Sequence, residues 1–320
     1  MEDLDRLCDM LSEVDPGMLT MPQTPEQMVE RIERSQRAFA RPSSPPDAET
    51  YFLVLEEAGE ILGTASLITN LGRDRPFYSF RITRDSKVSP ELGVKVELDI
   101  LHLVNDYHGD TEMGTLFLRR SARGGGRGKL LSYARLMLIA ADPVRFGARV
   151  MAEVRGWTDA SGKSPFWDAV GAKFFRVDYR RADTLSAREH RFIADLMPRY
   201  PIYADLLPEQ ARSVIGKPHP DAEPALALLK AQGFRFNNVV DIFDAGPCVD
   251  AYVEDIHLVR DSLVMSADEF RRTPYVRPVL VGATGFSRFA VAMANSAEAR
   301  PGTLERLDLD ETDPVRVFAP

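Results

Sequence analysis

The chain has 320 residues, of which 44% are hydrophobic and 28% charged, the composition of an ordinary folded protein long enough to bury its own core. Its formal net charge of −8 argues against a nucleic-acid-binding protein, because such a protein needs a basic surface to neutralise phosphates. The lack of a long apolar run, the acidic N-terminus and two distant cysteines, Cys8 and Cys248, predict a cytoplasmic protein without membrane contact or disulfides.

Two helices are predicted before the first strand, over residues 1–14 and 25–40. Both segments place apolar residues at helical spacing along one face. Thr24 is expected to cap the second helix, with Pro25 at its first helical position. The proline-rich segment 41–50 is expected to be a loop.

A β-hairpin is predicted next. It consists of two runs rich in strand-forming residues, 51–57 and 60–70, which are joined by a short turn that contains glycine. Residues 77–83 predict a third strand and residues 115–118 a fourth.

Beyond the fourth strand, the sequence alternates between helical and strand patterns. We predict a helix over 130–141, a strand over 149–156, and a helix followed by a strand within both 164–179 and 223–243.

A loop rich in glycine and arginine separates the fourth strand from the helix that follows it. Glycines expose backbone N–H groups, and the start of a helix attracts anions, so the loop is a candidate phosphate site. The P-loop pattern fails because Lys129 is followed by Leu130. Arg123, Gly126 and Gly128 instead fit R-x-x-G-x-G, which resembles the pyrophosphate loop of GCN5-related N-acetyltransferases. The alternative is a flexible surface turn.

Six segments carry a resemblance to a narrower family. In their order and spacing they resemble the arginine N-succinyltransferases, over about residues 18–260. The segments are TLFL at 115–118, MAEVRG at 151–156, SPFWDAVGAKFF at 164–175, FIADLMPRYPIY at 192–203, VIGKPHPDAEPA at 214–225 and GFRFNNVVDIFDAGP at 233–247.

The resemblance implies an α/β (α+β) fold of the GCN5-related acyl-CoA N-acyltransferase type. A splayed, mixed but mostly antiparallel sheet would be flanked by helices. The acyltransferase domain would span residues 1–248, with an inserted helical segment at about 185–216. Residues 249–320 would form a small β-rich subdomain.

The resemblance also implies a reaction. The family transfers succinyl from succinyl-CoA, a co-substrate, to the α-amino group of arginine by direct attack in a ternary complex, and no permanently bound cofactor is expected. A homo-oligomer, or a hetero-oligomer with a related subunit, is expected. The alternatives are ornithine as acceptor, another acyl-CoA as donor, or a non-catalytic subunit. The last is favoured by the lack of the strand that usually precedes the family's first helix.

His219 is the main catalytic candidate. Imidazole exchanges protons near neutral pH, and two flanking prolines would fix the loop that carries it. The resemblance assigns this histidine as a proton donor, and the alternative is a structural loop histidine. By the same resemblance, the acyl-CoA contact falls on Leu116. Its backbone would pair with the pantetheine arm like an added strand, and its side chain would lie in the core.

Three carboxylates are further candidates. Glu112, just before the fourth strand, could relay the amine proton, or it could be a solvated loop residue. Asp241 and Asp244 could bind the substrate guanidinium, or they could cap a turn. His102 and His108 match no zinc pattern, so we predict no metal site.

Overall fold

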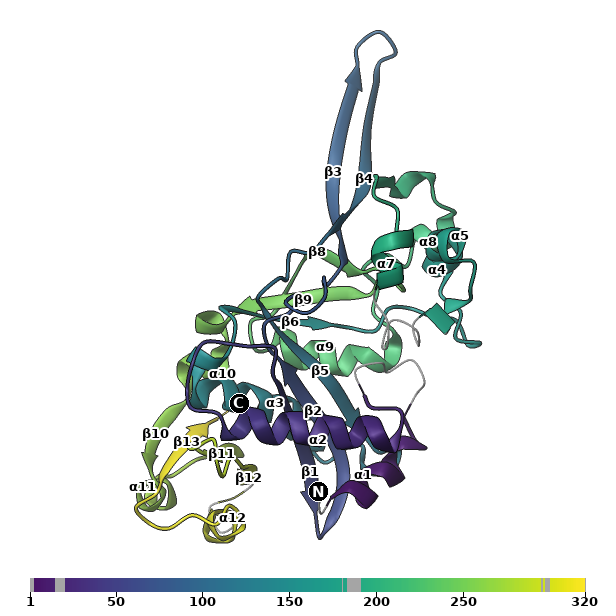
Figure 1. Cartoon of the computed structure of the whole chain (residues 1–320). Helices are drawn as coiled ribbons and strands as arrows, with labels where there is room; N and C mark the ends of the chain where they lie inside the picture. Colours follow the sequence, from purple (N-terminus) through teal and green to yellow (C-terminus); the bar gives the residue numbers. More distant parts are fainter. Residues whose placement is uncertain are drawn as a thin grey trace.

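A computed structural model describes residues 3–14, 21–179, 181–182, 191–294, 296 and 300–319. Within them, nine strands form one large sheet in the order β1-β2-β5-β6-β9-β8-β3-β4-β7 (Figure 1). These strands are β1 (Thr50–Glu57), β2 (Glu60–Ile68), β3 (Ser79–Ser89), β4 (Val94–Val104), β5 (Thr111–Leu118), β6 (Arg149–Glu153), β7 (Ile202–Tyr203), β8 (Arg235–Asp241) and β9 (Pro247–Tyr252).

Helices cover both faces of this sheet. Phe52 faces the cluster that includes α1 and α2, whereas the adjacent Tyr51 faces the cluster that includes α3 and α9, as expected for alternating side chains of a strand. The helices are α1 (Leu4–Leu11), α2 (Pro25–Ala40), α3 (Arg127–Ala141), α4 (Pro165–Ala169), α5 (Gly171–Phe175), α7 (Arg191–Leu196), α8 (Glu209–Arg212), α9 (Glu223–Lys230), α10 (His257–Asp261), α11 (Ala267–Arg272) and α12 (Arg300–Arg306).

The predicted N-terminal elements are confirmed. The side chain of Thr24 accepts a hydrogen bond from the backbone N–H of Gln27, and Pro25 is the first residue of α2. Strands β1 and β2 form the predicted antiparallel hairpin. Its turn holds Ala58 and Gly59 at φ values of 52° and 81°, the left-handed conformation that such tight hairpins require.

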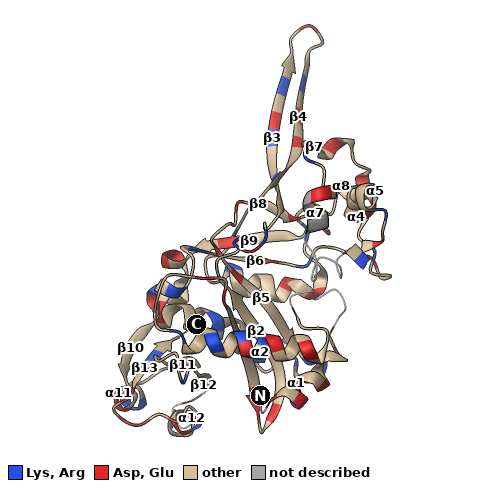
Figure 2. Ribbon diagram, viewed as in Figure 1, with Lys and Arg blue, Asp and Glu red and all other residues tan. Residues whose placement is uncertain are grey.

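The largest difference from the sequence prediction is a projecting hairpin. The predicted third strand is the start of β3, which continues to Ser89 and pairs with the unpredicted β4 over its whole length. We call residues 84–99 the arm; it extends away from the rest of the molecule (Figure 1). Acidic and basic residues mark both of its strands (Figure 2). Its tip exposes Val88 and Leu92 at 67% and 77%.

A second, four-stranded sheet follows the large one, in the order β10-β13-β11-β12. The predicted boundary at residue 249 falls within β9, which pairs with β6 and β8 of the large sheet. We therefore propose that the subdomain starts at Leu263. The four strands are β10 (Leu263–Ser266), β11 (Val279–Ala283), β12 (Val291–Ala294) and β13 (Pro314–Phe318).

Two other predicted features have mixed outcomes. The helix and strand predicted within 223–243 are confirmed as α9 and β8, but the strand predicted at the end of 164–179 is wrong. There, Arg176 follows the end of α5 in a left-handed conformation, and the carbonyl of Val177 accepts a hydrogen bond from the ring N–H of the buried Trp167. Of the helical insertion predicted at about 185–216, residues 185–190 lie outside the described part of the chain, and the remainder contains α7, β7 and α8.

Candidate active site

The large sheet is split between β5 and β6. These strands run parallel and pair at Thr111 with Val150 and at Glu112 with Met151, and their described residues beyond these positions are not paired with each other. Strand β6 pairs instead with β9 along its whole length. The carboxyl-terminal half of β5 therefore has a backbone edge that a ligand can meet (Figure 1).

A bulge lies on this half of β5. Ser66 pairs with Gly114 and Thr64 with Phe117, so two residues, Thr115 and Leu116, stand opposite one residue of β2. Thr115 has a φ of 49°, which is a genuine outlier for a β-branched residue. Such strain costs about 1–3 kcal/mol and persists only where the surroundings enforce it, often at functional sites.

Two side chains support the bulge from opposite directions. The hydroxyl of Ser66 donates to the Thr115 hydroxyl at 2.9 Å within the sheet. From α3, the guanidinium of Arg135 donates to the Gly114 carbonyl at 3.2 Å and to the Ser132 hydroxyl at 3.2 Å. Arg135 is only 2% exposed, and burial lowers its pKa to about 9. A charge this deeply buried has a substantial desolvation cost, so its position points to a specific role.

The sequence prediction missed Arg135. The signal was a single arginine within the apolar helical run 130–141, at a position where the neighbouring residues are buried. An arginine in such a run indicates a buried polar partner.

Glu112 is the last residue of β5 that pairs with β6, and it is 6% exposed. It is not the solvated loop residue of the alternative prediction. Burial raises the pKa of its carboxyl group, and the positive charges of Arg31, Arg75 and Arg135 partly offset this rise. A buried carboxylate with a raised pKa is suited to accept a proton near neutral pH.

Leu116 has a half-buried side chain that packs with the apolar cluster beneath β1, β2 and α3. Its side chain thus belongs to the core, as predicted. Its backbone forms part of the bulge that faces the split.

The glycine-rich loop follows β5 and leads directly into α3. Gly124, Gly125 and Gly126 all have positive φ, of 98°, 60° and 80°, a run that other residues would adopt only under strain. A Cβ atom built at Gly126 or Gly128 would meet no atom within 4 Å, so the space above the loop is open. The N–H groups of the first turn of α3 have no acceptor within the helix and form a natural anion site.

The two loop arginines differ. Arg127 is held by an ion pair with Glu57 at 2.6 Å, which partly neutralises its charge. Arg123 is exposed and forms no ion pair within the described part of the chain. Arg123 is therefore the better placed of the two to meet an anionic ligand.

His219 lies on the other side of the split. Its backbone N–H donates to the carbonyl of Arg155 at 2.8 Å, and Pro218 forms a bridge with Gly156, so its loop is fixed to the segment that follows β6. Its ring Nδ1 accepts from the N–H of Asp221 at 3.2 Å. This geometry places the proton of the neutral ring on Nε2. The ring is 18% exposed.

Asp241 is the last residue of β8 and Asp244 lies in the turn before β9, and both accept hydrogen bonds from backbone N–H groups. Asp241 accepts from the N–H groups of Phe243 and Asp244, at 2.7 and 2.8 Å. Asp244 accepts from Gly156 and Gly246, both at 2.7 Å. Burial and the neighbouring Asp244 raise the pKa of Asp241 well above its ordinary value. This geometry favours the turn-capping alternative over a guanidinium clamp.

His102 and His108 take no part in a metal cluster. The ring of His102 is hydrogen-bonded to the Thr83 hydroxyl at 2.9 Å. Across the described ranges, no group of three histidine, cysteine, aspartate or glutamate side chains is arranged to hold a metal ion. No helix in these ranges has the length and apolar character needed to cross a membrane.

Comparisons with known proteins give one consistent result. A family profile described as arginine N-succinyltransferase beta subunit matches residues 1–258. The arginine N-succinyltransferase subunit beta of Pseudomonas aeruginosa is 38% identical over 261 residues, covering 81% of this chain and 77% of the relative. The arginine N-succinyltransferase of Yersinia pestis (strain Pestoides F) is 34% identical, covering 99% of this chain and 96% of the relative.

A solved structure resembles the whole molecule. It is the arginine/ornithine succinyltransferase subunit AI from Pseudomonas aeruginosa, with a TM-score of 0.86 and 29% sequence identity. The superposition covers 99% of this chain and 96% of that chain, so the small C-terminal sheet is included in the similarity.

Proposed function

Because the chain belongs to the arginine N-succinyltransferase family, we propose that it transfers the succinyl group of succinyl-CoA to the α-amino group of L-arginine. The observation that supports this most strongly is the split beside β5, where a strained bulge and an open anion site lie on one continuous segment. A thioester can enter such a split with its pyrophosphate at the start of α3 and its pantetheine along β5.

The proposed reaction is a direct attack in a ternary complex. The neutral α-amine attacks the thioester carbon, and the carbonyl oxygen becomes an oxyanion stabilised by backbone N–H groups of the bulge at Leu116. The carbon–sulfur bond then breaks, the amine nitrogen loses a proton, and the coenzyme thiolate gains one. The succinylated arginine and free coenzyme A are the products.

Two groups on opposite sides of the split would move these protons. Glu112, a buried carboxylate with a raised pKa, would accept the proton of the amine. His219, as the doubly protonated imidazolium, would donate a proton to the leaving thiolate and return to the neutral ring. Arg123, Gly126 and Gly128 would hold the pyrophosphate. No permanently bound cofactor takes part in this scheme.

A coenzyme A release assay tests the proposal. It crosses succinyl-CoA and acetyl-CoA with arginine, ornithine and lysine, and we expect the highest kcat/KM with succinyl-CoA and arginine. A preference for ornithine or for acetyl-CoA would mean that the chain is a related acyltransferase with a different acceptor or donor. If no pair of donor and acceptor releases coenzyme A, the chain is a non-catalytic subunit.

We further propose that the protein works as an oligomer in the cytoplasm. Cys8 and Cys248 are both free thiols, which suits a reducing compartment. The arm exposes apolar side chains at its tip, and a two-stranded hairpin is marginally stable by itself in water, which favours contact with another subunit. Size-exclusion chromatography with light scattering checks this, since a monomeric mass at micromolar concentration contradicts it.

A further inference from the structure

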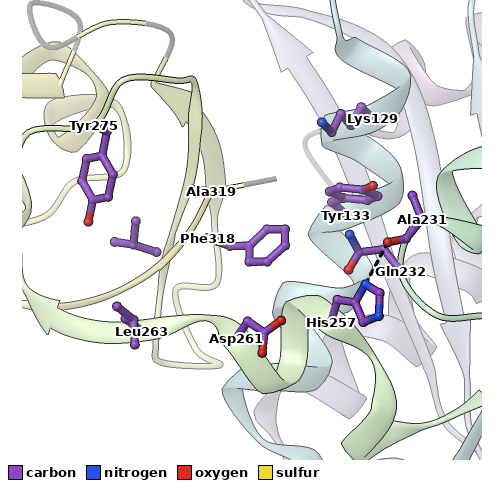
Figure 3. Close-up of a pocket in the computed structure, with 11 residues that line it drawn as sticks. Lys129, Tyr133, Ala231, Gln232, His257, Asp261, Leu263, Tyr275, Phe318 and Ala319 are labelled. Carbon is purple, nitrogen blue, oxygen red and sulfur yellow. Dashed lines mark hydrogen bonds between the residues drawn. The ribbon is translucent and has the colours of Figure 1, made fainter.

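A cavity of about 450 Å³ lies between the two sheets, outside the split. One wall comes from the start of α3 and the end of α9, and the opposite wall comes from strands of the small C-terminal sheet (Figure 3). None of the predicted site residues lines it. Its volume is that of a site for a small organic ligand.

Aromatic side chains form opposite walls of this cavity. Tyr133 projects from α3, and its ring meets that of Phe318 at a centroid distance of 6.5 Å. Tyr275 lies across the cavity on the side of the small sheet (Figure 3). Aromatic surfaces that face a common space favour a planar, aromatic ligand.

The polar groups of the cavity have hydrogen-bonding capacity left. The side-chain oxygen of Gln232 accepts from the N–H of Leu258 at 2.9 Å, which leaves its two amide hydrogens for another partner. The ring Nδ1 of His257 is bonded to the Ala231 carbonyl at 3.0 Å, so Nε2 is the acceptor of the neutral ring. A heteroaromatic base with both donors and acceptors on its edge suits this combination.

The cavity also carries a positive charge. The ammonium group of Lys129 lies 5.5 Å from the ring centre of Tyr133, and it forms no ion pair within the described ranges. The carboxylate at this site, Asp261, already accepts hydrogen bonds from Nε and Nη2 of Arg260, each at 2.7 Å. Lys129 therefore gives the cavity an affinity for an anionic group.

The cavity adjoins the proposed phosphate loop. Lys129 directly follows Gly128, in the first turn of α3, so a ligand anchored at the helix start reaches the cavity within about one helical turn, roughly 5 Å. A planar base and a phosphate, joined to a pyrophosphate, are the chemical parts of the nucleotide end of coenzyme A.

We propose that this cavity binds the adenosine 3′-phosphate end of the coenzyme, with Lys129 on the 3′-phosphate and Tyr275 against the purine. The proposal rests on the proposed function, because it requires an acyl-CoA in the split. It gives the small C-terminal sheet a direct role, since Tyr275 and Phe318 come from that part of the chain.

Calorimetry with coenzyme A and dephospho-coenzyme A, which lacks only the 3′-phosphate, tests this assignment. The wild-type protein should bind coenzyme A about tenfold more tightly than the dephospho form, as expected for a charge-assisted contact. Lys129→Ala should lose most of this preference and keep its affinity for the dephospho form. Tyr275→Ala should weaken both ligands by the same factor, because both carry the purine.

Lys95→Ala is the matched control, because Lys95 is an exposed lysine on the arm. It should leave both affinities unchanged. Equal affinity of the wild type for the two ligands, or a Lys129→Ala variant that weakens both equally, overturns the assignment of the cavity alone. If the wild type binds neither ligand, the proposed function fails and this assignment fails with it.

Discussion

The two sides of the split are built in different ways. The β5 side is one continuous stretch of chain, from the pairing residue Glu112 through the bulge and the glycine loop to Arg135 on α3. The β6 side is assembled from three distant segments, which meet where Arg155 and Gly156 bind the loop of His219 and the turn of Asp244. Local geometry thus shapes one side, and long-range contacts shape the other.

This difference separates coenzyme binding and proton acceptance from proton donation. The β5 side combines backbone groups with the buried Glu112 and Arg135, so changes there should act on the coenzyme, on the oxyanion and on the proton acceptor. Side chains held by remote contacts dominate the β6 side, so changes there should act on proton donation or on stability. Four predictions follow that contrast, from the largest expected effect to the smallest.

His219→Ala should have the largest effect, because it removes the proton donor. General acid catalysis is typically worth about 10²–10⁴-fold, so kcat should fall by that order while the melting temperature stays within a few degrees. His219→Gln should be nearly as impaired, since an amide cannot exchange protons at neutral pH. Steady-state kinetics with both substrates saturating, alongside thermal melts, decides the matter. A Gln variant with most of the wild-type kcat would show that the histidine is structural.

Arg135→Gln should reduce kcat by about 10–10²-fold, because the bulge loses its support at the Gly114 carbonyl. The same variant should move the pH profile. Activity requires ionised Glu112 and is lost as pH falls through the pKa of that group. Arg135 lowers this pKa, so its removal raises it and shifts the acid limb of kcat to higher pH.

Arg135→Lys is the control for this pair of effects. Lysine keeps the positive charge but lacks the planar guanidinium group that donates to two partners at once. The acid limb of the pH profile should therefore stay in place, while part of kcat is lost. An unchanged acid limb in Arg135→Gln would mean that Glu112 is not the group that accepts the proton.

Gly126→Asp should weaken succinyl-CoA binding by more than about tenfold, since it places a negative charge beside the pyrophosphate. Gly126 has a φ of 80°, so any side chain there also adds backbone strain. Gly93→Asp is the matched control, because Gly93 has a φ of 62° and lies at the tip of the arm. Calorimetry that shows equal affinities for the two variants would contradict the loop assignment.

Asp244→Asn should act on stability rather than on substrate. An amide cannot accept from both Gly156 and Gly246 as the carboxylate does, so the free energy of unfolding should fall by about 1–3 kcal/mol. The KM for arginine should change by less than about twofold. A large rise in the KM for arginine, without loss of stability in urea titrations, would instead favour the guanidinium clamp.

The sequence was informative where local rules act alone. The cap at Thr24, the hairpin turn at Ala58 and Gly59, and the glycine loop are each fixed by a few neighbouring residues, and each was predicted. The β4 strand was missed despite a local signal, the alternation of apolar and charged residues from Val94 to Ile100. Its residues near the tip, such as Val94 and Val96, are exposed, and the strand is defined by its pairing with β3.

The partners of polar side chains were the other limit. The sequence placed Asp244 near a turn but gave no indication that Gly156, 88 positions away, donates to it. It likewise could not show that Arg135 reaches the Gly114 carbonyl. Such contacts depend on how the sheet brings separate segments together, and residue spacing does not encode them.

The arm has a consequence for amide hydrogen exchange. In the arm, residues 84–99, strands β3 and β4 pair with each other and have no third strand within the described residues. A hairpin without a packed face opens in local fluctuations that leave the rest of the sheet intact. The outer amides of the arm should therefore exchange in seconds in an isolated chain, and they should become protected only when another molecule packs against it.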